Sequence, residues 1–111
     1  MRIYKILRPA EWADLERLGE TGGAPVDLAD GFIHFSTAAQ VAETAAKHFA
    51  GEEGLILAAF DATAMGDALR WEVSRGGATF PHLYAPLRRT DVIWHAPLPL
   101  VGGAHVFPEG M

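Results

Sequence analysis

A continuous apolar run in the middle of the chain most limits how this sequence can fold. Residues 55–60 read Leu-Ile-Leu-Ala-Ala-Phe, without a polar side chain. A run of strand length with no polar alternation is typical of a strand that is buried on both faces. The run therefore predicts a central buried strand.

The segments before and after this run predict two main helices. The first begins at Pro9, because proline is favoured at the first helical position, and it ends at Gly19 or just beyond. The second is alanine-rich, begins at Ala38 and ends in the glycines of 51–54. Between them, residues 21–30 contain glycine, proline and aspartate without a hydrophobic period, so we expect a loop there.

Further strands are predicted from residue type and alternation. They are residues 2–7, 32–36, 69–73, 80–87 and 91–95. In the third of these, alternation places Trp71 inward and Glu72 outward, and the two prolines of 80–87 limit that segment to a sheet edge or a structured loop. Strands predominate and no repeat or linker is present, so residues 1–111 are expected to form a single α+β domain.

The strand before the second helix, Asp-Gly-Phe-Ile-His-Phe-Ser-Thr, is the strongest candidate for a functional site. Alternation puts His34 on one face with Phe32 and Ser36. Thr37 is predicted to be the helix N-cap, with Gln40 completing a capping box. A helix start favours an anion, so this stretch predicts a site for a small anionic molecule. The alternative is that the hydroxyl groups only cap the helix and that His34 is an ordinary half-buried histidine.

Composition removes several classes of function. There is no cysteine, which excludes a disulfide scaffold, a thiolate zinc site and cysteine catalysis. The formal net charge of −5 argues against general nucleic-acid binding. No leader pattern or apolar run of membrane length is present, so we expect a cytoplasmic protein without a membrane partner.

The five histidines do not form a metal-binding pattern. They are His34, His48, His82, His95 and His105. None has the paired spacing of a helical metalloenzyme motif, so no metal ligand is assigned. A nucleophilic Ser36 would lack a glycine elbow, and the sequence has neither a phosphate-binding loop nor a dinucleotide fingerprint.

The order of these elements resembles that of the tRNA 2′-phosphotransferases. That family has a His-Leu-Ser strand, a helix, and a hydrophobic strand ending in Asp-Ala with a methionine nearby. The matching residues here are 33–36, Asp61, Ala62 and Met65. The resemblance implies an ADP-ribosyltransferase-like fold with small antiparallel or mixed sheets, in which His34 stands where a related branch stacks a tyrosine on nicotinamide. No cofactor is certain, and the resemblance implies NAD or an ADP-ribose-like ligand.

A still closer resemblance covers the whole chain, which is identified as a member of the domain-of-unknown-function 952 family. The segments that carry it are Tyr4-Lys5-Ile6, residues 30–37 with Gln40, Trp71-Glu72, and residues 80–84. This family implies the same fold but carries no established activity.

The departures from the phosphotransferases argue against ordinary NAD cleavage. Lys5-Ile6-Leu7 stands where those enzymes carry His-Gly-Thr, and the catalytic glutamate of ADP-ribosyltransferases has no clear counterpart. We expect a cleft for a nucleotide-like or phosphorylated small molecule, with group transfer as one use of it, and we expect His34 and His82 to face that cleft together. The candidate residues are His34, His82 and Glu72 for catalysis, and Lys5, Ser36, Thr37, Gln40 and Tyr84 for ligand binding.

Two alternatives remain open at the level of sequence, and the chain could be a monomer or a homodimer in either. One is a binding or regulatory module that has the cleft without catalysis. The other is an interaction protein in which Trp71, Trp94 and the proline-rich C-terminal strand form a homodimer face. Core packing is the simpler interpretation of the tryptophans. A convergent polar cleft would favour small-molecule binding, and a flat apolar patch would favour the interaction protein.

Overall fold

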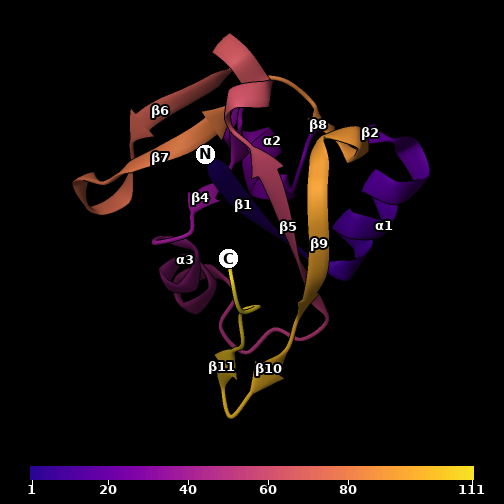
Figure 1. The fold of residues 1–111 in the computed structure, drawn as a ribbon, viewed down its shortest axis with the longest axis vertical. Coiled ribbons are helices and arrows are strands. Elements are labelled where there is room, and N and C mark those ends of the chain that lie inside the picture. The colour runs from indigo at the N-terminus through magenta and orange to yellow at the C-terminus, as the bar shows by residue number, and fades with distance from the viewer.

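A four-stranded antiparallel sheet forms the centre of the computed structural model, which describes the side chains of residues 1–74 and 76–111. Its strands, in spatial order, are β4 (Ser36–Thr37), β1 (Arg2–Leu7), β5 (Leu55–Asp61) and β9 (Val92–Leu98). β5 lies between β1 and β9 (Figure 1), and Leu57 to Phe60 are fully buried. The central buried strand predicted from the apolar run is therefore confirmed.

Each face of this sheet has its own hydrophobic core. The helices that cover the two faces are α1 (Pro9–Leu18) and α3 (Val41–His48). On one face Ile3 packs in the same cluster as Leu15 of α1, and on the other Tyr4 packs in the same cluster as Ala45 of α3. This division follows from strand alternation, because successive side chains of β1 point to opposite faces. Figure 1 shows the two helices on opposite sides of β1 and β5.

A short helix, α2 (Pro25–Asp30), replaces the loop expected for residues 21–30. Pro25 occupies the first helical position, and the Ala24 backbone N–H donates to the Asp27 carboxylate at 2.7 Å. Gly31 ends the helix at a φ of +83°. These are ordinary start and stop signals. The prediction of a loop was wrong because a helix this short has no room to show a hydrophobic period.

A second antiparallel sheet has three strands in the order β3-β7-β6. They are β3 (Ile33–His34), β7 (Thr79–Leu83) and β6 (Leu69–Val73). The chain passes from this sheet to the central one at Phe35, so the single strand predicted there is split into β3 and β4. β7 is the middle strand despite Pro81, and the prediction of an edge was wrong. The Pro81 carbonyl accepts from the Phe35 N–H at 3.1 Å, so the backbone of Pro81 faces Phe35. Phe35 lies just beyond the end of β3, and the N–H that proline lacks is therefore not needed for the β3–β7 pairing.

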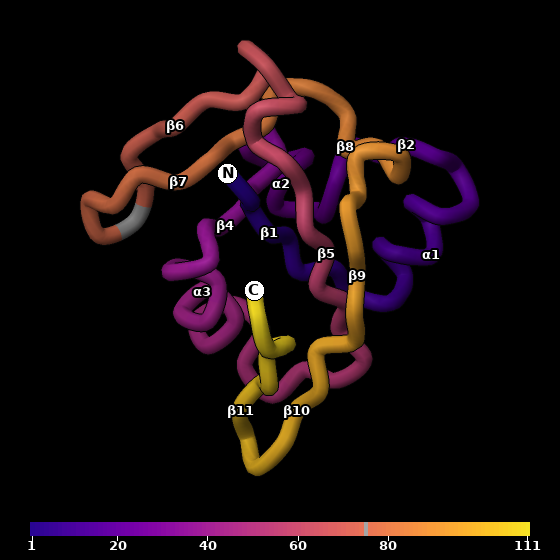
Figure 2. Tube along the Cα trace, viewed as in Figure 1, coloured from indigo at the N-terminus to yellow at the C-terminus, as the bar shows by residue number. Residues whose placement is uncertain are grey.

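The burial of β6 agrees with the predicted alternation only at its start, where Leu69 packs against the core and Arg70 is exposed. The remaining residues depart from the prediction. Trp71 is 44% exposed and Val73 is 73% exposed, whereas Glu72 is half-buried. The hairpin of β6 and β7 extends beyond the central sheet (Figure 2). On the side of β6 that carries residues 69, 71 and 73, the core therefore covers Leu69 and leaves Trp71 and Val73 exposed. Glu72 is partly covered because it faces His82 and Tyr84.

Short pairings complete the outline of the fold. They are β2 (Glu20–Thr21) with β8 (Leu87–Arg88), and β10 (Leu100–Val101) with β11 (Ala104–His105). The class is α+β with antiparallel sheets and few helices, as the sequence predicts. Among the described residues, no helix has the length and apolar character to cross a membrane.

Candidate functional site

His34 and His82 lie side by side on one face of the three-stranded sheet. They are register partners in β3 and β7, and their ring centroids are 5.4 Å apart. The structure thus confirms that the two side chains share a face. The expected cleft is not found at them, because neither histidine belongs to the described lining of the two depressions reported below. Because side chains alternate along each strand, other residues project from the same face. The members of this group, which we call the histidine face, are Phe32, His34, Arg70, Glu72, His82 and Tyr84.

Glu72 is held by two hydrogen-bond donors of the histidine face. His82 Nδ1 and the Tyr84 hydroxyl donate to the same Glu72 oxygen, at 2.9 Å and 2.7 Å. The bonds from Tyr84 and then from His82 lower the pKa of Glu72, and the shared bond raises the pKa of the Tyr84 phenol. A carboxylate can only accept hydrogen bonds, so Nδ1 of His82 carries the proton of this bond.

Access to this group is unequal. The Glu72 side chain is 38% exposed, whereas the His82 side chain is only 5% exposed. A ligand would therefore meet the carboxylate first, and His82 orients that carboxylate from behind. Sequence analysis placed Glu72 on an outward face, and the structure shows that His82 and Tyr84 orient its carboxylate there.

Aromatic contacts tie the histidine face together. Phe32 stacks on His82 with centroids 4.1 Å apart and an interplanar angle of 30°, and it lies 4.6 Å from the His34 ring. The Arg70 guanidinium lies 4.7 Å above the ring of Tyr84, a cation–π distance. The face therefore combines aromatic surface, one exposed cation and one exposed carboxylate.

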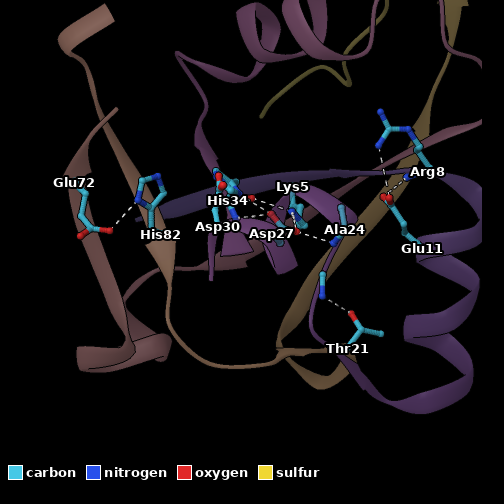
Figure 3. A network of polar contacts seen from close by, with 11 residues as sticks. Lys5, Arg8, Glu11, Thr21, Ala24, Asp27, Asp30, His34, Glu72 and His82 are labelled. Atoms are coloured by element: carbon cyan, nitrogen blue, oxygen red, sulfur yellow. Dashed lines mark hydrogen bonds and ion pairs between the residues drawn. The ribbon is translucent and has the colours of Figure 1, made fainter. Parts of the chain in front are cut away.

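A buried carboxylate, Asp27, supports His34 from beneath the face (Figure 3). Asp27 Oδ1 accepts from His34 Nδ1 at 2.6 Å and from the His34 backbone N–H at 3.0 Å. Asp27 Oδ2 lies 2.9 Å from Lys5 Nζ, which also donates to the His34 carbonyl at 3.0 Å. Sequence analysis missed Asp27. Its third place in α2, after Pro25, was the available signal, and it has meaning only once that helix is recognised.

The charges of the Asp27 cluster compensate one another. Burial raises the pKa of Asp27, but the hydrogen bond from His34 and the charge of Lys5 outweigh that effect and hold the pKa at about 2. Asp30 lies 2.9 Å from His34 Nε2, so carboxylates engage both ring nitrogens of His34. Lys5 and His34 are thus committed to internal contacts, which makes them better suited to positioning than to contacting a ligand.

The start of α3 differs from the sequence prediction. The helix begins at Val41 with Gln40 as its N-cap, and Thr37 belongs to β4. Pairing with β1 keeps Thr37 extended, since it lies opposite Ile3. The Thr37 N–H donates to Gln40 Oε1 at 3.1 Å, so the capping contact from Gln40 exists although Thr37 is not the cap.

Ser36, Thr37 and Gln40 lie at the junction of β4, β7 and α3, away from the histidine face. The buried Ser36 hydroxyl is 2.8 Å from the Thr44 hydroxyl, and Gln40 Nε2 donates to the Thr79 carbonyl at 2.8 Å. The single strand predicted to carry both Ser36 and His34 is divided at Phe35, so His34 lies in the three-stranded sheet and Ser36 in the central sheet. Of the eight predicted site residues, the structure brings together Lys5, His34, Glu72, His82 and Tyr84.

Two shallow depressions flank these groups. The smaller, about 260 Å³, lies beside Phe32 and reaches Asp27. The larger, about 560 Å³, lies at Thr37 and includes Arg2 and apolar walls. Of the histidine face, only Phe32 contributes to the described lining of the smaller depression. We therefore place the candidate site on the open surface of the histidine face, where His82 and Tyr84 hold Glu72. Within residues 1–74 and 76–111, no group of three or more His, Asp or Glu side chains could hold a metal ion.

These features define a small α+β domain in which a central sheet supports a smaller sheet with two carboxylate-paired histidines. The family model described as "Protein of unknown function (DUF952)" matches residues 6–95. The chain belongs to this family, which confirms the closer of the two resemblances seen in the sequence.

The fold is also found in solved structures of a related protein. The chain is similar to protein CC0527 from Caulobacter crescentus, with 50% sequence identity. For the crystal structure the TM-score is 0.92, covering 96% of this chain and 94% of that one. For the solution structure the TM-score is 0.84, covering 94% and 90%. No curated protein shows significant similarity to the chain.

Proposed function

We propose that the histidine face binds a nucleotide-like or phosphorylated small molecule. The observation that carries this proposal is the accessible Glu72 carboxylate, which His82 and Tyr84 hold in one orientation. A partly exposed carboxylate that is already oriented suits a binding or catalytic group, because a group held in the required geometry loses little further freedom when a ligand binds.

The chemistry of the face matches the parts of a nucleotide. The rings of Phe32 and Tyr84 offer apolar surface for a base or a nicotinamide. The Glu72 carboxylate is an acceptor for ribose hydroxyls, as acidic residues are in dinucleotide sites. The exposed Arg70 guanidinium can pair with phosphate oxygens.

The relation to ADP-ribosyltransferases and tRNA 2′-phosphotransferases is part of this proposal. It is supported by the order in which β1, α1, β3, α3 and β5 follow one another along the chain. Group transfer with Glu72 as the catalytic carboxylate is the enzymatic form of the proposal. A binding module without catalysis is the second form, and it is favoured by the engagement of both His34 ring nitrogens by carboxylates.

Isothermal titration with ADP-ribose, AMP and ribose 5-phosphate tests binding. We expect at least one of these probes to bind, and we expect Glu72→Gln to weaken it about tenfold through loss of a charge-assisted hydrogen bond. Glu16→Gln is the matched control, because Glu16 is another exposed glutamate that bonds to an arginine, Arg89. Affinity that is equal in wild type and Glu72→Gln would contradict the assignment of this site.

Incubation with NAD, followed by measurement of nicotinamide release, separates the two forms. We expect no release above buffer, because cleavage requires the dinucleotide to be fixed and the developing positive charge to be stabilised. Lys5, which stands where the related enzymes have a dinucleotide-fixing histidine, is buried against Asp27. Turnover that Glu72→Gln abolishes would instead establish Glu72 as a catalytic residue.

A further inference from the structure

We propose that two copies of the chain associate through the open edges of β6, antiparallel to each other, around a two-fold axis at Trp71. β6 is the outer strand in the order β3-β7-β6, and Figure 1 shows it on the outside of its hairpin. The pairing would join the two three-stranded sheets into one continuous sheet. The association itself does not rest on the proposed function.

The backbone of β6 directs its free hydrogen-bonding groups outward at Trp71. At one end of the hairpin the Ser74 N–H donates to the Ala78 carbonyl at 2.9 Å. At the other end the Tyr84 N–H donates to the Ala68 carbonyl at 2.7 Å. Bonded and non-bonded positions alternate along an antiparallel pair, so the even-numbered residues of β6 bond to β7. The odd-numbered residues, centred on Trp71, therefore present their N–H and C=O groups to the open edge.

The strand opposite Trp71 agrees with this alternation. Its register partner is Pro81, which has no N–H to give, and the Pro81 carbonyl already accepts from Phe35 on the far side of β7. An unpaired strand edge is a template for pairing with another chain. In β6 that template is centred on a large apolar side chain that is 44% exposed.

The side chains of β6 are complementary to a second copy of the same strand. An antiparallel pair centred on Trp71 places Arg70 directly opposite Glu72 of the partner subunit, and the two-fold axis repeats that pair. Opposite charges directly across two strands stabilise the pairing. On the other face, the exposed Val73 lies opposite Leu69 of the partner subunit, and the two Trp71 side chains meet at the axis. The strand reads Leu-Arg-Trp-Glu-Val, and this complementarity selects a second copy rather than an unrelated partner.

The outer edge of the central sheet lacks this arrangement. β9 contains Pro97 and is followed by Pro99, and proline on an edge strand is a common protection against pairing. β6 contains no proline in any of its five residues. The chain thus protects one outer edge with proline and leaves the β6 edge open.

The association would also change the candidate site. Cross-strand neighbours in a non-hydrogen-bonded pair have Cα atoms about 4.5 Å apart, so Arg70 of the partner subunit would lie next to Glu72. This second arginine would add a phosphate-binding group to the histidine face, a consequence that does rest on the proposed function. A seam of five residues is short, so we expect an association weaker than that of obligate dimers, which bury far more surface.

Sedimentation over a range of protein concentrations tests the association with charge variants. We expect wild type to shift from monomer to dimer as concentration rises, and Arg70→Glu to remain monomeric because it places two glutamates opposite each other. The double variant Arg70→Glu/Glu72→Arg restores opposite charges in the same register, so we expect the dimer to return. Arg17→Glu, on the exposed surface of α1, is the control and should behave as wild type. A wild type that is monomeric at every concentration, or a double variant that does not dimerise, would overturn the proposal.

Disulfide trapping tests the register without charge changes, because the chain has no cysteine of its own. In Trp71→Cys the two introduced residues face each other across the axis with Cα atoms about 5.5 Å apart, within disulfide range. In Val73→Cys they lie four residues apart along the strands, about 13 Å, and cannot be joined. We expect a covalent dimer from the first variant alone. Equal yields from both would overturn the register. ADP-ribose binding, measured at a concentration where the protein is monomeric, tests the proposed binding site independently of the dimer. Failure of the dimer and failure of the binding site can therefore be told apart.

Discussion

The chain contains two carboxylate–histidine pairs that differ mainly in their access to solvent. In the Asp27–His34 pair the carboxylate is fully buried, and it also faces the buried ammonium of Lys5. The Glu72–His82 pair has the opposite arrangement, with a buried histidine and an accessible carboxylate. In both pairs the histidine donates from Nδ1, and in both the pKa of the carboxyl group is lowered.

The two carboxylates differ in exposure to solvent, and this difference indicates which of them can contact a ligand. A buried carboxylate with four donors within hydrogen-bond distance has no remaining capacity for a ligand, and Asp27 has the Ala24 N–H, Lys5 and both donors of His34. Glu72 has one oxygen engaged by protein donors and is partly open to solvent. We therefore infer that Asp27 positions Lys5 and His34, and the proposed contact with a ligand falls to Glu72.

The largest expected effect is on stability, at Asp27. Asp27→Asn leaves the buried ammonium of Lys5 without its counter-charge, and removing one member of a buried pair costs about 3–5 kcal/mol of the free energy of unfolding. Urea denaturation measures this loss. The control is Asp14→Asn, which breaks the exposed pair with Arg17 and should cost under about 1 kcal/mol. Equal costs at the two positions would show that the Asp27 cluster is not a structural centre.

A backbone contact beside Asp27 gives the next effect. Gly23 has a φ of +91°, and a Cβ there would lie 2.3 Å from Asp27 Oδ2. We expect Gly23→Ala to cost about 2–3 kcal/mol, from left-handed strain together with displacement of the carboxylate. Gly103→Ala, at a φ of +85° with no described atom within 4 Å of its Cβ, carries the strain alone and should cost less. Thermal unfolding of the two variants compares them directly, and similar melting temperatures would contradict the contact.

Acid pH should weaken the same cluster. The pKa of Asp27 is about 2 in the folded chain against an ordinary value of 3.8, so its contribution is fully present above the ordinary value. As pH falls from about 4 to 2 the contribution is lost, and the shift corresponds to about 2 kcal/mol. The stability difference between wild type and Asp27→Asn, measured by urea denaturation, should therefore narrow by that amount over this range. A constant difference would place the pKa of Asp27 at its ordinary value.

The smallest effect on stability is expected at Glu72. Because its carboxylate is accessible, Glu72→Gln should leave the urea midpoint close to that of wild type while it weakens binding of ADP-ribose. The control here is Tyr84→Phe, which removes one of the two donors to Glu72 and should weaken binding less than Glu72→Gln. A large loss of stability in Glu72→Gln would assign Glu72 to the scaffold, as Asp27 is assigned.

Sequence periodicity predicted the elements that are long and have a covered face. The apolar run gave β5, and the helical spacing from Pro9 gave α1 with its end at Gly19. α2 was missed because it is too short to show a hydrophobic period. The division at Phe35 was missed because it depends on pairing with distant strands, β7 before it and β1 after it. The burial of Trp71, Glu72 and Val73 was predicted wrongly because alternation shows the two sides of a strand without showing how far along it the rest of the chain covers each side.

The candidate site was predictable in part for the same reason. His34, His82 and Tyr84 were correctly placed together because a resemblance to a known family supplied the pairing of their strands. Asp27 was missed because its partners come from β1, β3 and the residue before α2, which no local pattern connects. Ser36 was expected beside His34, but the chain passes from β3 to β4 between them and the Ser36 hydroxyl bonds to Thr44 of α3.

Amide chemical shifts during titration with ADP-ribose test most directly whether the Glu72 pair, and not another part of the chain, meets the ligand. The account predicts that the largest changes lie at residues 70–72 and 82–84, with smaller changes at 32–34. It predicts little change at residues 37–41, which border the larger depression at Thr37. Changes concentrated at 37–41 and Arg2, with the Glu72 amide unmoved, would contradict the account and place the site at the start of α3.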